Sequence, residues 1–72
     1  MKGYYLNLNQ QISGQYELHT EECLYFEKTK NFDYIGYYSS CEEAIRQAKL
    51  KHPDKINKID GCYYCCNECN NG

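Results

Sequence analysis

The chain has no tryptophan, one proline and one methionine among its 72 residues. Its aromatic content comes instead from nine tyrosines and two phenylalanines. A tyrosine ring buries a large surface while its hydroxyl needs a partner or water, so we expect a thin core with several rings half-exposed along a sheet. A core in a chain this short supplies only about 3–5 kcal/mol. We therefore expect a single domain, residues 1–72, that needs an additional cross-link.

Long hydrophobic runs are also lacking. No apolar segment is long enough for a signal peptide or a membrane span. We therefore expect a cytoplasmic protein without membrane contact, in a compartment where thiols stay reduced and clustered cysteines more often bind a metal than form disulfides. A mature secreted domain expressed with an added methionine would look the same, so a disulfide-bonded alternative stays open.

The chain also lacks an excess of charge of one sign, since its formal net charge is only −2. Lysines occur in the second half of the chain, but acidic residues are interleaved with them: Glu42, Glu43, Lys49, Lys51, Asp54, Lys55, Lys58 and Asp60. A nonspecific nucleic-acid binder normally shows a basic face, which this pattern does not provide. The sequence also has no Gly-rich phosphate loop, no Ser-His-Asp arrangement and no catalytic carboxylate pair recognisable by spacing.

Hydrophobic alternation predicts three strands, at residues 4–8, 15–20 and 34–38. The Ser-Gly pair that ends residues 9–14 predicts a hairpin connection. We expect further connections at residues 21–33, which include an aromatic patch (Leu24-Tyr25-Phe26), and at the polar residues 54–61. The predicted fold class is α+β: a small three-stranded antiparallel sheet with one helix and a C-terminal cysteine knuckle at residues 62–69.

A helix is predicted to begin after Ser40, because Ser40 and Glu43 form a capping box in which each side chain satisfies a backbone donor. Apolar residues then recur on one face: Cys41, Ala44, Ile45 and Ala48. Pro53 ends the helix near His52. We expect Cys41 to be a buried small hydrophobe and His52 to be a favourable charge at the helix C-terminus.

Three short patterns contain potential metal ligands: His19-x3-Cys23, Cys62-x2-Cys65 and Cys66-x2-Cys69. Zinc prefers four thiolate or imidazole ligands in a tetrahedron, often as two pairs that are distant in sequence. The spacing therefore predicts one structural zinc ion (Zn²⁺) bound by His19, Cys23, Cys62 and Cys65. The alternative second pair is Cys66 and Cys69.

Two other interpretations of the cysteines stay open. The six cysteines could form a three-disulfide framework, which allows 15 connectivities, and the adjacent Cys65 and Cys66 are common in such proteins. If Cys66 and Cys69 are free, they could instead form a reactive dithiol, because a Cys-x2-Cys pair can have a lowered thiol pKa.

Three segments together resemble the Ada-type metal-binding domain family over roughly residues 15–69: His19-Thr20-Glu21-Glu22-Cys23, Tyr37-Tyr38-Ser39-Ser40-Cys41-Glu42-Glu43-Ala44-Ile45 and Gly61-Cys62-Tyr63-Tyr64-Cys65. The resemblance implies a small sheet, a packed helix and one tetrahedral zinc. In the DNA-repair member, the first residue of the ligand-x3-Cys pair is a cysteine that accepts a methyl group from a DNA phosphotriester. His19 occupies that position here, and an imidazole that ligates zinc does not perform this thiolate chemistry. The C-terminal Gly-Cys-Tyr-Tyr-Cys-Cys segment also resembles that of small uncharacterised bacterial proteins. This second resemblance implies no function.

Together these features predict a noncatalytic zinc-binding module that contacts a protein or a nucleic acid. Tyrosine is common at interfaces, and an exposed Tyr-rich edge strand would allow a homodimer through sheet pairing. The alternatives are a secreted or oxidised disulfide-rich protein and a thiolate-based methyl acceptor or redox protein.

Overall fold

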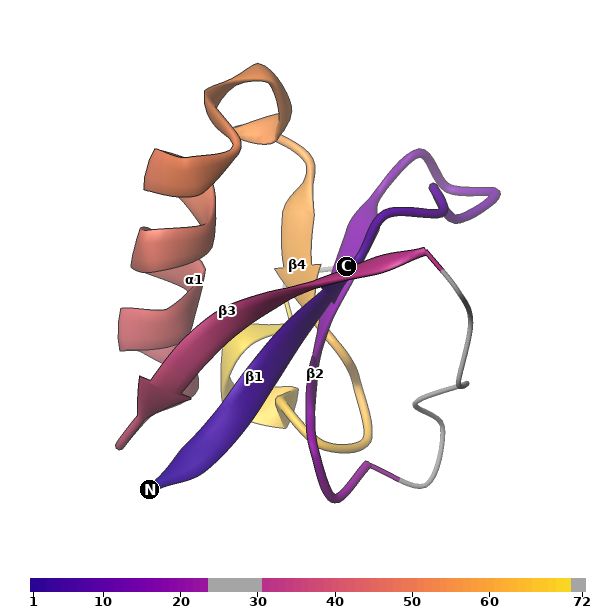
Figure 1. Ribbon diagram of the computed structural model, residues 1–72. Helices are drawn as coiled ribbons and strands as arrows, with labels where there is room; N and C mark the ends of the chain where they lie inside the picture. Colours follow the sequence, from indigo (N-terminus) through magenta and orange to yellow (C-terminus); the bar gives the residue numbers. More distant parts are fainter. Residues whose placement is uncertain (24–30, 71–72) are drawn as a thin grey trace.

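Figure 1 shows the computed structural model of the chain, in which residues 1–23 and 31–70 are described. The helices and strands are β1 (Lys2–Asn7), β2 (Tyr16–Thr20), β3 (Phe32–Tyr38), α1 (Cys41–Lys51) and β4 (Ile59–Gly61), with 3-10 turns η1 (Pro53–Lys55) and η2 (Asn67–Cys69). The α+β class is confirmed, and the three predicted strands are present to within two residues at each end. The predicted aromatic patch at residues 24–26 lies outside the described residues.

The sheet has four strands in the order β3-β1-β2-β4, so the predicted three-stranded antiparallel sheet was wrong in this detail. β1 pairs antiparallel with β2 and β3, whereas β4 pairs in parallel with β2. A polar loop was predicted at residues 54–61, where the structure has β4. This strand has only three residues, and two of them, Asp60 and Gly61, are of types that disfavour strands. All three residues are buried, so burial between neighbouring elements compensates for the weak local preference.

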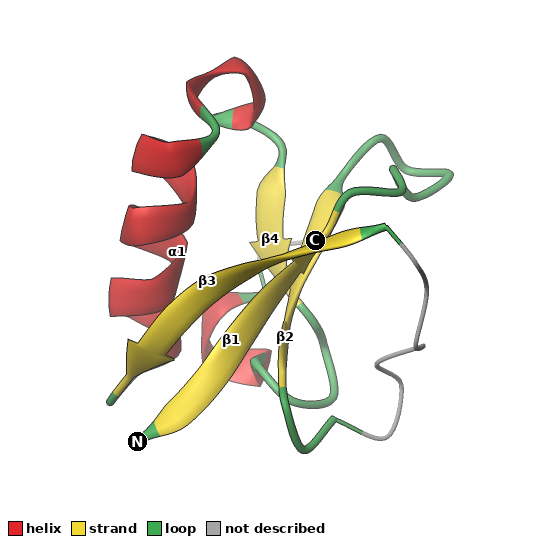
Figure 2. Cartoon of the chain, viewed as in Figure 1, coloured by secondary structure: helices red, strands yellow, loops and turns green. Residues whose placement is uncertain are grey.

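The helix α1 packs on one face of the sheet (Figure 2). Ala44 and Ala48 are fully buried and, because they are small, let the helix approach the sheet closely. Leu6 and Leu18 lie opposite them and are the largest fully buried side chains among the described residues. A core with so few large side chains agrees with the expectation of a thin core.

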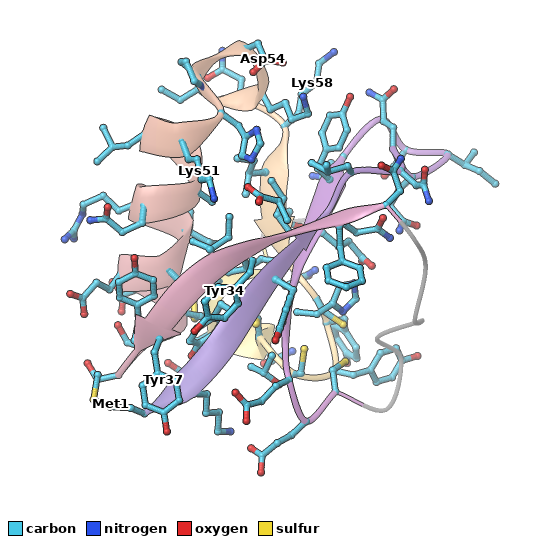
Figure 3. All side chains as sticks on the ribbon, in the orientation of Figure 1. Met1, Tyr34, Tyr37, Lys51, Asp54 and Lys58 are labelled. Carbon is cyan, nitrogen blue, oxygen red and sulfur yellow. A yellow bond between two sulfur atoms is a disulfide. The ribbon has the colours of Figure 1, made fainter. Side chains whose placement is uncertain are left out.

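A β-bulge in β3 decides which of its residues face the core. Tyr4 of β1 pairs with Gly36 and Tyr5 pairs with Tyr34, which leaves Ile35 as the extra residue of β3. Gly36 has φ +149°, a backbone conformation that favours glycine. Because of the bulge, Ile35 packs against the core, while Tyr34 projects from the other face of the sheet, where Figure 3 labels it.

Both ends of α1 are fixed by side chains. At the start, Ser40 Oγ accepts a hydrogen bond from the Glu43 amide at 3.3 Å, which confirms the predicted N-cap. At the end, His52 Nε2 lies 2.7 Å from Asp33 Oδ2, and Lys51 also bonds Asp33. Burial alone would raise the pKa of Asp33, but the hydrogen bonds from His52 and Lys51 hold that pKa below its ordinary value. His52 therefore ties the helix to β3 through a specific carboxylate.

A disulfide joins Cys41, the first residue of α1, to Cys69 in η2 across a sequence separation of 28 residues. Cys41 is buried as predicted, but its role as an unbonded small hydrophobe was wrong because its sulfur is bonded to Cys69. Sequence alone does not place the helix start against η2, so this pairing could not be deduced from the cysteine spacing.

Candidate metal centre

The parallel pairing of β2 and β4 brings two distant parts of the chain to one place. Because the two strands are parallel, their C-terminal ends lie side by side. The hydrogen bonding between them continues past β4 through the Cys62 amide, which donates to Leu18 O at 3.0 Å. Cys23 follows β2 in a turn closed by its amide and Thr20 O at 3.1 Å. Figure 3 shows sulfur atoms gathered near this end of β2.

His19, Cys23, Cys62 and Cys65 form one cluster in which the potential ligand atoms all lie within 4.8 Å of one another. The Sγ atoms of Cys23 and Cys62 are 3.8 Å apart, and Cys65 Sγ is 4.0 Å from His19 Nδ1. A tetrahedral ion with metal–sulfur bonds of about 2.3 Å holds two sulfurs about 3.8 Å apart. The four residues can therefore hold a metal ion with little rearrangement.

Two residues of the cluster are buried, and the other two, Cys23 and Cys65, are partly exposed. His19 and Cys62 are buried, with 3% and 2% of their surfaces exposed. Burial raises the pKa of the Cys62 thiol to about 12, so a metal ion must displace a proton to bind this sulfur. The Thr20 amide donates to Cys65 Sγ at 3.3 Å, a contact that stabilises negative charge on the sulfur.

Gly61 makes the knuckle after β4 possible. A Cβ atom at this position would lie 2.6 Å from Cys66 O and 2.9 Å from Cys69 Cβ, too close for any other residue without a shift of the backbone. Asn70 Nδ2 donates to Gly61 O at 2.9 Å and to the buried Asp60 at 3.2 Å, which fixes the end of the knuckle. These contacts hold the start of the knuckle against its end.

Glu17 lies beside the cluster and was not among the residues predicted for the site. Its Oε1 lies 3.5 Å from His19 Nε2, while the other ring nitrogen, Nδ1, faces Cys65. Histidines that bind metals usually donate their second N–H to a carboxylate, which fixes the tautomer and the ring orientation. Burial, and then the charge of Asp60, raise the pKa of Glu17. The only signal in the sequence is that residues 17 and 19 lie on the same face of a strand.

Replacing Glu17 with Gln should lower the metal affinity by about tenfold, the lower end of the range for such partners, because an amide oxygen still accepts but carries no charge. Competition with a chromophoric chelator measures this change. Glu22→Gln is the matched control, since it removes the same charge beside Cys23 while Glu22 pairs with Lys2. Equal affinities for the two variants would show that Glu17 does not support His19.

The structure does not bring the alternative pair to His19 and Cys23. Cys66 is buried, with its Sγ 3.9 Å from that of Cys65, but it lies outside the four-residue cluster. Cys69 is bonded to Cys41 and has no thiolate to offer a metal. For the same reason, Cys66 and Cys69 do not form the free dithiol that a redox activity would need.

Among the described residues, no helix has the length and apolar character needed to cross a membrane. No known protein family, no curated protein and no solved structure matches the chain.

Proposed function

We propose that this chain is a noncatalytic module whose fold is held by one structural zinc ion and whose surface contacts a partner macromolecule. The observation that carries the proposal is the cluster of His19, Cys23, Cys62 and Cys65, with ligand atoms within 4.8 Å of one another. Two residues come from the end of β2 and two from the segment after β4. A metal ion at this position would therefore join the two halves of the chain.

Zinc is the ion that this donor set favours. Thiolates and imidazole select soft or borderline metals, and a tetrahedral set of three sulfurs and one nitrogen is typical of structural zinc sites. Four protein ligands leave no open position for a water or a substrate, in contrast to catalytic zinc sites. The buried His19 and Cys62 further limit access to the ion.

The resemblance to the Ada-type metal-binding domain supports zinc but not methyl transfer. The position that accepts a methyl group in the DNA-repair member is His19 in this chain, and His19 Nε2 lies 3.5 Å from Glu17 Oε1. This arrangement suits an imidazole that binds a metal through Nδ1 and leaves no thiolate at the reactive position. The module is therefore proposed to be structural.

Exposed aromatic side chains supply the proposed contact surface. Tyr34 and Tyr37 of β3 and Tyr63 and Tyr64 of the knuckle are all about half-exposed or more, and the last two rings contact each other edge to face at 5.2 Å. Tyrosine is enriched at protein interfaces. The net charge of −2 favours a protein partner over a nucleic acid.

The partner could be a second copy of the chain, paired strand to strand along the edge strand β3. Such pairing would have to displace a contact that the edge already makes. Lys51 Nζ bonds the carbonyl oxygen of Tyr34 at 3.1 Å. A lysine at a sheet edge disfavours pairing with another strand. Contacts through tyrosine side chains therefore fit the surface better than strand pairing does.

The competing function is that of an oxidised, disulfide-rich protein, which the Cys41–Cys69 disulfide favours. The other four cysteines are free thiols, however, and the Cys23 and Cys62 sulfurs stand 3.8 Å apart, the spacing of zinc ligands. The two functions therefore predict different masses for the same chain.

Intact mass spectrometry under native and denaturing conditions separates these functions. The proposal predicts one bound zinc in the native spectrum and, because there is one disulfide, a denatured mass two hydrogens below the fully reduced value. The competing function predicts no zinc and a mass six hydrogens below the reduced value, and this result would overturn the proposal. Substitution with Co²⁺ gives a further check, because tetrahedral thiolate coordination produces strong visible absorption.

A further inference from the structure

A cavity lies beside the candidate metal centre. It has a volume of about 320 Å³ and opens between the start of β1, the N-terminal end of α1 and the C-terminal knuckle; its walls include Lys2, Tyr4, Ser40, Cys66 and Glu68. Cys65 also reaches its wall, but the other three residues of the metal cluster do not line it. The cavity therefore adjoins the proposed zinc site and shares Cys65 with it.

The N-terminus of α1 presents a backbone donor at this cavity. The helix has 11 residues, and its first internal hydrogen bond runs from the Ala44 amide to Ser40 O at 3.2 Å. The Glu43 amide is satisfied by Ser40 Oγ. Within the described part of the chain, the amides of Cys41 and Glu42 have no acceptor, as expected for the first turn of a helix. Of these two residues, Cys41 lines the cavity.

An independent donor, the Tyr4 hydroxyl, belongs to a residue that lines the same cavity. Only 5% of Tyr4 is exposed, and its hydroxyl makes no hydrogen bond to any residue that the structure describes. Burial, followed by the charges of Cys66, Cys65 and Glu68, raises the pKa of Tyr4. Tyr4 lines the cavity together with these three residues. A buried hydroxyl without a partner is destabilising, which makes it a good donor for a ligand.

We propose that this cavity binds a small oxyanion, a carboxylate or a phosphate group, through the Cys41 amide and the Tyr4 hydroxyl. The positive end of the helix dipole attracts such groups, and backbone amides at a helix start bind their oxygens. Lys2 adds a positive charge at the wall, partly neutralised by Glu22 at 3.5 Å.

Glu68 opposes the bound anion, because its carboxylate lies on the wall of the same cavity. A singly charged carboxylate suffers less from this repulsion than a doubly charged phosphate. The carboxylate is therefore expected to bind more tightly, and removal of the Glu68 charge should strengthen the binding of both anions.

A titration of the protein as purified, followed by ¹H–¹⁵N NMR, tests the proposal with sodium acetate and inorganic phosphate, against sodium chloride at matched ionic strength. We expect a saturable shift of the Cys41 amide with acetate or phosphate but not with chloride. Tyr4→Phe should weaken binding about tenfold through loss of one hydrogen bond to a charged group, and Glu68→Gln should tighten it. Tyr16→Phe is the matched control, because Tyr16 lies outside the cavity, near Lys55.

Tyr4→Phe is expected to fold and to melt no lower than the parent protein, since it removes only a hydroxyl without a partner. Loss of binding in this variant would therefore not reflect unfolding. Binding of acetate, of phosphate or of both supports the proposal and identifies the anion class. The proposal is overturned if neither anion gives saturable shifts beyond those with chloride, or if Tyr4→Phe binds as tightly as the Tyr16→Phe control.

Discussion

Cys62→Ser should bind zinc far more weakly than the parent protein and should be largely unfolded at room temperature. Cys62 is one of four clustered potential ligands and is almost completely buried. Structural zinc supplies about 10–16 kcal/mol of apparent binding free energy in zinc-finger peptides, and this energy is available for folding. The core of a chain this small supplies only about 3–5 kcal/mol. Loss of the ion therefore removes most of the stabilisation.

Circular dichroism and NMR dispersion, recorded with and without a chelator, measure this effect. Chelation of the parent protein should reproduce the unfolding caused by Cys62→Ser, and added zinc should reverse it. Cys66→Ser is the matched control, since it makes the same sulfur-to-oxygen change at an equally buried position of the knuckle, outside the cluster. If Cys66→Ser loses zinc while Cys62→Ser retains it, the ligand set is wrong.

Removing the disulfide should have the second-largest effect. The double variant Cys41→Ala/Cys69→Ala should lower the free energy of unfolding by roughly 3.5 kcal/mol, the loop-closure entropy for a separation of 28 residues. Zinc should remain bound at one ion per chain, because neither cysteine belongs to the cluster. Urea unfolding of the zinc-loaded protein, combined with metal analysis, tests both expectations.

The disulfide and the proposed zinc site constrain overlapping parts of the chain. The loop closed by Cys41 and Cys69 contains Cys62 and Cys65. Each cross-link therefore reduces the conformational freedom of the same segment in the unfolded chain. The cost of removing one should therefore depend on the presence of the other, and the two effects should not add. Loss of zinc from the disulfide-free variant under native conditions would contradict the assignment of separate roles.

Local patterns predicted much of the fold. The alternation of Tyr4, Tyr5 and Leu6 predicted β1 with the correct faces, because side-chain direction in a strand depends only on position. The Ser40 cap predicted the start of α1, because the cap bonds an amide three residues away. The strand β4 could not be predicted this way, since its pairing with β2 depends on residues about forty positions earlier.

The candidate site likewise has a part that local sequence patterns predicted and a part that they did not. The spacings His19-x3-Cys23 and Cys62-x2-Cys65 predicted the four residues that the structure clusters, because each pair is local. Sequence could not show that Cys69 is bonded to Cys41, nor that Glu17 approaches His19. Both contacts depend on tertiary packing, which spacing along the chain does not report.

The parallel pairing of β2 with β4 also sets an order of events during folding. The register joins Tyr16 to Ile59, so this contact closes one of the longest loops in the chain. Contacts of such long range form slowly and late, after local hairpins and helices. During synthesis, His19 and Cys23 emerge well before Cys62 and Cys65. Capture of the metal is therefore expected to be the final step of maturation, after the antiparallel strands and the helix have formed.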